Sequence, residues 1–251
     1  MCCTGHFINR SSNHSNYWRR DICACACFSW RLLQRVQTKM RMDKYSNFNQ
    51  LLASEKKDID FRRRVKQSNS GWLILAPHGG GIEPGTSELA AAIGRFNHSL
   101  YTFEGIKKSD NRTLHITSTQ FDDLQVLKLL KSSNGTIAIH GCSGNEQIAY
   151  VGGLQDDIRN KIIAQISENG IKATISSNPS LQGRDMNNIC NRNSIGKGVQ
   201  IELTEGLRSA MFVSLTRVGR KIRTKLFKTF VSNIRAVIKG YNSSAIHKLL
   251  N

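Results

Sequence analysis

Two histidines and one glutamate in this sequence follow segments with the pattern of buried strands. His78 comes soon after the apolar run at residues 72–76, and Glu83 lies five residues later, beyond three consecutive glycines. His140 directly follows a second apolar run at 136–139. Two neutral imidazoles and one carboxylate form the ligand set of many catalytic zinc sites, which leaves a fourth position for water. The spacing therefore predicts a metal site.

The glycine-rich loop between His78 and Glu83 has a second interpretation, as a phosphate-binding loop. Three glycines let the backbone adopt positive φ and pass close to a ligand. A phosphate-binding loop would also need Lys followed by Ser or Thr at a fixed spacing after the glycines, and this loop lacks them. A single histidine at a strand end is more often a hydrogen-bonded structural residue. The metal-site prediction therefore depends on the pair, because His78 and His140 each lie at the end of a predicted strand and precede a glycine.

Hydrolysis at such a site also requires a proton acceptor and a group that binds the substrate. Glu202 lies between apolar neighbours and is the candidate proton acceptor. The alternative interpretation is a buried carboxylate paired with an arginine. Arg184 and Arg192 flank a loop rich in Asn, which suits bidentate binding of a carboxylate but is also typical of a solvated loop. Glu205 is expected to start a helix, where the helix dipole favours an acid.

Short β-branched or aromatic runs alternate with amphipathic segments along the middle of the chain. The runs that predict strands are 72–76, 100–103, 114–117, 136–139, 171–175 and 199–203. The segments that predict helices are 87–96, 121–131 and 154–169. This alternation predicts a three-layer α/β fold, with a mostly parallel or mixed sheet and helices on both faces. Chemistry in such sheets gathers at the carboxyl ends of the strands, where the two histidines lie.

The charge of the chain is strongly positive. Its 251 residues include 36 Lys and Arg against 18 Asp and Glu, a net charge of +18, which indicates a polyanionic partner: nucleic acid, a lipid surface or an acidic polymer. Residues 217–239 contain eight basic and no acidic residues among apolar residues at helical spacing, which predicts an amphipathic C-terminal helix. No apolar run approaches the roughly 20 residues that cross a bilayer, so we exclude a membrane-spanning protein.

The first 41 residues differ from the rest of the chain. They hold seven basic residues against one acid and show no strand or helix period. Five of the seven cysteines fall here: Cys2, Cys3, Cys23, Cys25 and Cys27. Their spacing fits neither a disulfide framework nor a zinc ribbon, and the segment lacks a signal-peptide pattern. We expect a disordered or mis-assigned extension at 1–41, with the natural start at Met40 or Met42, a hydrolase domain at 42–240 and a tail at 241–251.

Several blocks, in the same order, resemble the poly-γ-glutamate hydrolases of bacteriophages and prophages, some of which are labelled phage replication-like proteins. The blocks are 76–88, 101–105, 114–118, 140–141, 183–192 and 198–203. The resemblance extends from about Met42 to Lys239. It implies a zinc carboxypeptidase-like fold with one zinc ion on His78, Glu83 and His140. It also implies hydrolysis of γ-glutamyl amide bonds in an acidic polymer.

The resemblance further implies roles for residues around this metal. Glu202 would be the general base, and Arg184 and Arg192 would contact substrate carboxylates. Glu104 and His115 are candidates for the pocket wall, without an assigned role. A polyanionic substrate would also give the positive charge a use in long-range steering at low salt.

Several expectations about context follow. We expect a monomer, encoded by a phage or prophage, made in the cytoplasm of a bacterial host and released on lysis. Cys142, two residues beyond His140, could approach the metal or pack beneath it, and we favour packing. The alternative hypothesis is a basic nucleic-acid-binding accessory protein of phage replication. That hypothesis explains the positive charge, but it does not explain why two histidines, each followed by glycine, lie at the ends of predicted strands.

Overall fold

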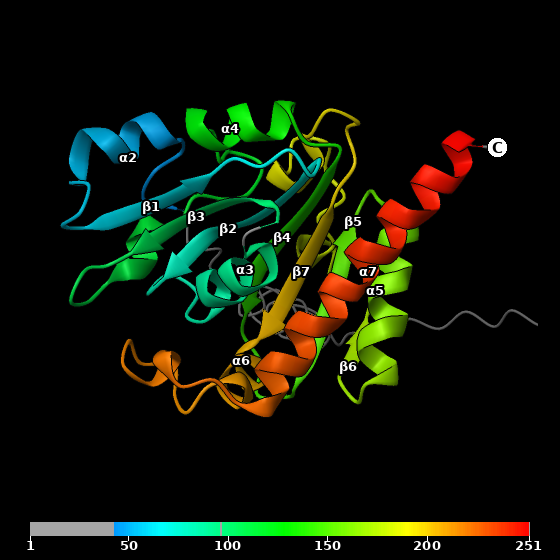
Figure 1. Ribbon diagram of the computed structural model, residues 1–251. Coiled ribbons are helices and arrows are strands. Elements are labelled where there is room, and N and C mark those ends of the chain that lie inside the picture. Colours follow the sequence, from blue (N-terminus) through cyan, green and yellow to red (C-terminus); the bar gives the residue numbers. More distant parts are fainter. Residues whose placement is uncertain (1–42, 96, 251) are drawn as a thin grey trace, which may run out of the picture. The chain divides into compact units, whose positions relative to one another are not determined.

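A mixed sheet of seven strands organises the part of the chain that the structure describes (Figure 1). The structure is a computed structural model that describes residues 43–95 and 97–250, with side chains up to residue 242. The predictions for residues 1–41, including those for their five cysteines, lie outside the described residues.

The strands follow the order β1-β3-β2-β4-β7-β5-β6 across the sheet. They are β1 (Phe61–Lys66), β2 (Trp72–Gly80), β3 (Ser99–Gly105), β4 (Gly135–Cys142), β5 (Ile148–Gly153), β6 (Lys172–Thr174) and β7 (Val199–Thr204). Strands β3, β2, β4 and β7 are parallel neighbours, as are β5 and β6. The edge strand β1 is antiparallel to β3, and β5 is antiparallel to β7. The α/β fold with a mixed sheet is therefore confirmed, and the carboxyl ends of β2, β4 and β7 meet at one edge.

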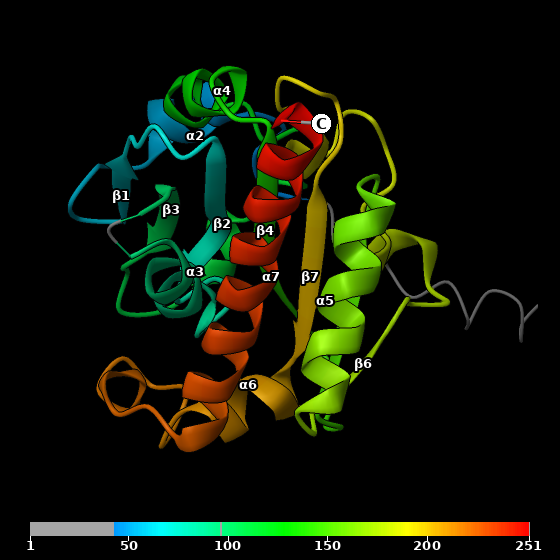
Figure 2. The same cartoon turned by 45° about the vertical axis from the view of Figure 1, so that its right-hand side comes forward.

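Helices cover both faces of the sheet, as predicted. They are α2 (Phe48–Ser54), α3 (Thr86–Gly94), α4 (Leu124–Lys131), α5 (Asp156–Glu168), α6 (Glu205–Met211) and α7 (Lys225–Leu250). Short 3₁₀ turns occur at η1 (Asn111–Leu114), η2 (Pro179–Leu181), η3 (Ile189–Asn191) and η4 (Gly219–Lys221). One buried apolar cluster joins the sheet to α3, α5, α6 and α7, and a second joins it to α2 and α4. Figure 2 shows α3, α7 and α5 side by side over the face of the sheet that packs against the first of these clusters.

The amphipathic C-terminal helix predicted from residues 217–239 is α7. Its apolar stripe is buried against the sheet: Phe227, Phe230, Val231, Ile234, Val237 and Ile238. Burial of these side chains is the main force that holds α7 in place. The helix begins at Lys225, after the η4 turn, and continues to Leu250. The boundary predicted at residue 240 therefore falls inside the helix.

One predicted strand is wrong. Residues 114–117 do not form a strand, because η1 ends at Leu114 and the following segment is tied to the start of the described chain. The amide and the hydroxyl of Thr117 donate to Asp43 Oδ2 at 2.6 and 2.7 Å. These bonds replace the ladder that a strand would need.

The strands β1 and β5 were missed by the sequence prediction. In β1, three consecutive arginines hide the alternation of a strand. Arg62 and Arg64 project toward Glu104 of β3, with N–O distances of 2.7 and 3.1 Å. The Glu104 side chain is buried, so its charge is balanced by β1. This carboxylate therefore ties the edge strand to the sheet.

Candidate metal centre

The loop between β2 and α3 brings His78 and Glu83 together. The Glu83 amide donates to the His78 carbonyl at 2.9 Å, and the Thr86 hydroxyl donates to the Glu83 carbonyl at 2.9 Å. Gly80 has φ of 67°, and a Cβ there would lie 2.4 Å from the Gly105 carbonyl oxygen. Only glycine permits this turn so close to β3. As a result, Glu83 Oε1 lies 3.2 Å from His78 Nδ1.

Strand β4 brings His140 to the same place. Because β2 and β4 are parallel neighbours, their carboxyl ends lie side by side. His140 Nδ1 is 3.2 Å from His78 Nδ1 and 3.8 Å from Glu83 Oε2. The Gly141 amide donates to Glu83 Oε2 at 2.8 Å and orients the carboxylate. The structure thus brings the three predicted ligands together.

Burial and charge determine the protonation of these three groups. Burial lowers the pKa of His140 to about 3, so its imidazole is neutral. Burial alone would lower the pKa of His78, but the adjacent Glu83 carboxylate raises it above its ordinary value. Burial likewise opposes ionisation of Glu83, yet the two imidazoles lower the pKa of this carboxyl to about 2. The cluster therefore presents an ionised carboxylate beside two buried imidazoles.

This donor set fits a divalent transition-metal ion. His78 Nε2 donates to the Ile116 carbonyl at 2.8 Å, so the neutral form of His78 directs its Nδ1 lone pair at Glu83 and His140. Such an outer hydrogen bond is usual behind a ligating histidine. The Nδ1 atoms of two imidazoles that face each other across 3.2 Å need a shared proton or cation between them. His140 Nε2, in contrast, is buried and has no hydrogen-bond partner among the described residues.

A third imidazole, His115, belongs to the same cluster. Its ring stacks on His78 with centroids 4.0 Å apart, and its Nε2 lies 3.9 Å from Glu83 Oε1. Its Nδ1 lies 2.8 Å from Asp43 Oδ1, a carboxylate–histidine arrangement that often supports a metal ligand. Within the described ranges, the ligand atoms of His78, Glu83 and His115 all lie within 4.8 Å of one another. His115 therefore competes with His140 as the third ligand.

The Asp43 carboxylate fixes the orientation of His115. Burial opposes ionisation of Asp43, but hydrogen bonds from His115 and Thr117 lower its pKa to about 2. The ionised carboxylate accepts the Nδ1 hydrogen of His115, and the His115 Nε2 atom faces Glu83 Oε1. The sequence prediction placed His115 in a strand and gave it no role, and its partner Asp43 is 72 residues away. The sequence feature that pointed to His115 was the resemblance of residues 114–118 to the hydrolase family.

Glu202 lies beside this cluster on β7. The β4–β7 register pairs it with His140. Its Oε1 accepts a hydrogen bond from Gln200 Nε2 at 3.0 Å, and Gln200 Oε1 accepts one from Asn188 Nδ2 at 2.8 Å. Burial, and then the charge of Glu83, raise the pKa of Glu202 well above its ordinary value. A carboxyl with a raised pKa at a strand end is suited to proton transfer.

The arginine partner that the alternative interpretation gave to Glu202 is not found. No arginine in the described part of the chain forms an ion pair with this carboxyl. The charge of Arg208 lowers the pKa of Glu202, but this effect is smaller than the upward shift that burial and Glu83 cause. The helix predicted to start at Glu205 is confirmed, since α6 begins there with Thr204 as its N-cap.

The loop of residues 183–192 supports Glu202 through Asn188 but directs its arginines elsewhere. Arg184 Nη1 lies 3.4 Å from Asp156 Oδ1 in a half-exposed pair. Arg192 Nη1 donates to the Phe121 carbonyl at 3.0 Å. Neither contact involves a member of the histidine cluster, so binding of substrate carboxylates by these arginines stays a prediction.

Arg208 of α6 was not singled out from the sequence, yet it connects three segments around the cluster. Its buried guanidinium donates to the carbonyls of Leu203, Pro84 and Cys142 at 3.1, 2.8 and 3.1 Å. These segments carry Glu202, Glu83 and His140. Burial raises the pKa of the Cys142 thiol to about 11. Packing of Cys142 stays our interpretation.

Replacing Arg208 with methionine is expected to destabilise the fold. Methionine fills much of the volume but leaves three carbonyls without their donor, at a cost of about 3 kcal/mol. For a domain of this size the melting temperature should fall by roughly 6–12 °C. Thermal and urea unfolding measure the change. The control Arg112→Met removes an exposed guanidinium and should shift stability by less than about 0.5 kcal/mol. Equal effects would show that the three bonds contribute nothing specific.

Comparison with protein families agrees with this geometry. Residues 45–233 match the family described as poly-gamma-glutamate hydrolase. The chain belongs to this family. The resemblance found in the sequence blocks is thereby confirmed.

Relatives of this family member include prophage and phage proteins. The SPbeta prophage-derived UPF0714 protein YoqZ of Bacillus subtilis (strain 168) is 41% identical over 179 residues, which cover 71% of this chain and 65% of YoqZ. The solved structure of a bacteriophage poly-gamma-glutamate hydrolase shares 31% identity with a TM-score of 0.78, over 80% of this chain and 99% of that one. Zinc-free YndL shares 33% identity with a TM-score of 0.74, over 79% and 98% of the two chains. None of the helices described here is both long and apolar enough to cross a membrane.

Proposed function

We propose that this chain is a zinc-dependent hydrolase of γ-glutamyl amide bonds in poly-γ-glutamate. The observation that carries the proposal is the convergence of His78, Glu83 and His140 at the carboxyl ends of β2 and β4, beside Glu202. Family membership supports hydrolysis of this polymer, and the phage relative is described by that activity. The zinc-free description of YndL supports zinc as the metal.

His78, Glu83 and His140 would hold the ion in this proposal. When bound, zinc supplies Lewis-acid polarisation of the scissile carbonyl and makes water at the site more acidic. The protein contributes the arrangement of its ligands: Gly141 orients Glu83, and the Ile116 carbonyl orients His78. His115 is the alternative third ligand, because its Nε2 faces the same carboxylate.

Glu202 is the proposed acid–base group. Within the described residues only its Oε1 accepts a hydrogen bond, from Gln200, so the carboxyl is held in place by one oxygen. The other oxygen is left to take a proton from the attacking water and to return it to the leaving amine. Arg184 and Arg192 are kept as proposed contacts to the flanking carboxylates of the polymer.

Removal of the metal tests this proposal. Purified chain should cut poly-γ-glutamate, with a loss of solution viscosity and the release of shorter chains. Chelation should abolish the cleavage, and added zinc should restore it. α-Linked polyglutamate serves as the control substrate, since it carries the same charge with a different amide bond. Full activity after elemental analysis confirms metal-free protein would refute zinc dependence, and zinc-loaded protein that leaves every γ-glutamyl substrate intact would refute the substrate.

Expression in the cytoplasm of a bacterial host, release on lysis and a monomeric state stay predictions. Each can be tested on the natural protein.

A further inference from the structure

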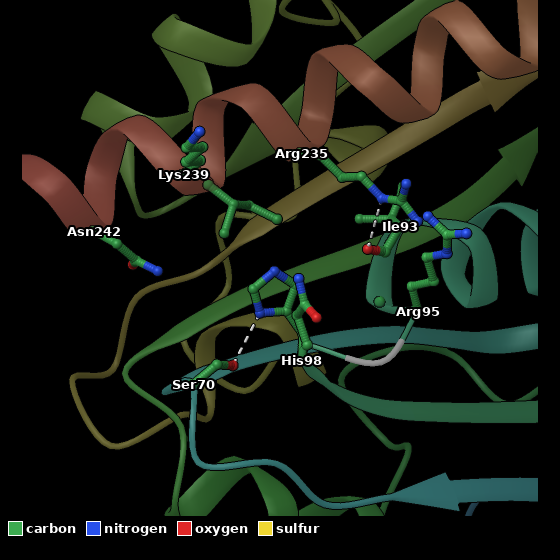
Figure 3. A pocket seen from close by; sticks show the side chains of 10 residues that line it. Ser70, Ile93, Arg95, His98, Arg235, Lys239 and Asn242 are labelled. Atoms are coloured by element: carbon green, nitrogen blue, oxygen red, sulfur yellow. Dashed lines mark hydrogen bonds between the residues drawn. The ribbon is translucent and has the colours of Figure 1, made fainter.

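A basic cavity lies between the end of α3, the start of β3 and the middle of α7 (Figure 3). Its volume is about 490 Å³. Arg95, Arg235 and Lys239 contribute basic groups to its walls, and His98 and Asn242 add polar ones. The His98 ring projects toward the middle of the cavity and is held by a 2.9 Å hydrogen bond between Nδ1 and the Ser70 hydroxyl.

A second cavity, of about 360 Å³, lies next to the first along the same two helices. It shares the side chains of Arg95 and Arg235 with the first and adds Arg223 and Lys228. We call the two cavities together the α3–α7 groove, defined by Arg95, His98, Arg223, Lys228, Arg235 and Lys239. Arg95, Arg223 and Lys228 are exposed, so their charged ends are available along the groove.

The charges of Arg95, Arg223, Lys228 and Arg235 are not balanced by acids among the described residues that line the α3–α7 groove. No Asp or Glu is among the described residues that line it. Arg95, Arg223, Lys228 and Arg235 form no ion pair within the described ranges. Burial, and then the charge of Arg95, lower the pKa of Arg235. The guanidinium of Arg235 donates to the carbonyls of Ala92 and Ile93, which fixes one cation in position. A ligand with negative charge would relieve this repulsion.

The groove is remote from the histidine cluster. Ser70 precedes β2 and His98 precedes β3, so the first cavity lies at the amino edge of these strands, whereas His78 lies at the carboxyl end of β2. From Ser70 to His78 the extended chain covers roughly 25 Å. A ligand that occupies both places must therefore be a long chain.

We propose that the α3–α7 groove is a second binding site for a polycarboxylate chain, which anchors long poly-γ-glutamate away from the place of cleavage. The inference rests on the proposed function for the identity of the polymer. Two small cavities in series suit a flexible single chain with one carboxylate per residue. They do not suit duplex DNA, whose major groove alone is about 12 Å wide. Anchoring raises the effective concentration of the polymer at the histidine cluster.

Paired charge-removing variants of the full chain test this site. The test variant combines Arg95→Gln with Lys228→Gln, and the control combines Lys128→Gln with Lys131→Gln on α4, at the opposite face of the sheet. All four side chains are exposed, and each pair removes two charges, so long-range steering weakens equally in both. Thermal melting checks that both variants fold.

The readouts are the dissociation constant for fluorescently labelled long poly-γ-glutamate, in metal-chelated protein, and the ratio of kcat/KM on long polymer to that on a short γ-glutamyl oligomer. The test variant should bind long polymer roughly three- to tenfold more weakly at low salt, with a similar fall in the ratio, and added salt should reduce the difference. The control variant should change both readouts by less than about twofold.

Equal losses in the two variants would overturn the inference, because net charge alone would then explain them. No loss in the test variant would overturn it as well. Failure of the proposed function is recognised separately. If wild-type protein cuts neither long nor short substrate but the test variant alone loses polymer affinity, the groove is supported while the hydrolase assignment is not.

Discussion

His140→Ala is expected to abolish zinc binding and hydrolysis together. The substitution removes one of the three proposed ligands, and His78 with Glu83 alone hold zinc far more weakly than the full set of three. Loss of an outer-shell partner alone typically weakens metal affinity 10- to 100-fold, so loss of a ligand should exceed about 100-fold. Turnover should fall by roughly 10³-fold or more. Elemental analysis and the polymer assay measure the two losses.

A readout independent of activity comes from thermal stability. Zinc that binds only the folded protein should raise the melting temperature of wild type in proportion to RT ln(1 + [Zn]/Kd), and His140→Ala should lose that shift. Without metal the variant should still fold, because the substitution removes one side-chain hydrogen-bond contact, between His140 Nδ1 and His78 Nδ1, and a buried Nε2 that has no partner among the described residues.

His115→Ala separates the two candidate ligand sets. If His140 is the third ligand, this variant keeps zinc and loses only the stacking contact with His78 and the bond to Asp43. If His115→Ala is metal-free and His140→Ala retains zinc, the predicted ligand set is wrong and His115 takes the place of His140.

The part of the site predicted from the sequence is the part that strand topology dictates. His78 and His140 each follow an apolar run, and parallel strands that are neighbours must place their carboxyl ends together. Glu83 was found because only five residues and a glycine turn separate it from His78. The alternation of strands and helices also predicted the layers, since each element must bury one apolar face.

The part that was missed depends on contacts that local patterns do not encode. Arg208 acts through carbonyls on three segments, and any buried arginine near a turn would look the same in the sequence. His115 is placed by Asp43 rather than by a strand end. The strand β1 pairs at the edge of the sheet, where side chains need not alternate between apolar and polar, so periodicity cannot reveal it.

Glu202→Gln is expected to keep zinc and to lose turnover by roughly two to four orders of magnitude, the usual contribution of acid–base catalysis. The amide matches the carboxyl in shape, and its oxygen can still accept the hydrogen bond from Gln200. It cannot take a proton from water. The substitution also removes a carboxyl whose charge is disfavoured by burial and by Glu83, so stability should not fall.

The matched control is Glu205→Gln, the same substitution at the exposed first residue of α6. It weakens a favourable helix-dipole interaction by about 0.3–1 kcal/mol and should leave kcat unchanged. Full turnover in Glu202→Gln would mean that another group moves the proton. A variant that loses both zinc and turnover would instead place Glu202 among the groups that hold the ion. The proton-transfer role therefore depends on one contrast: metal content that matches wild type, together with a kcat that does not.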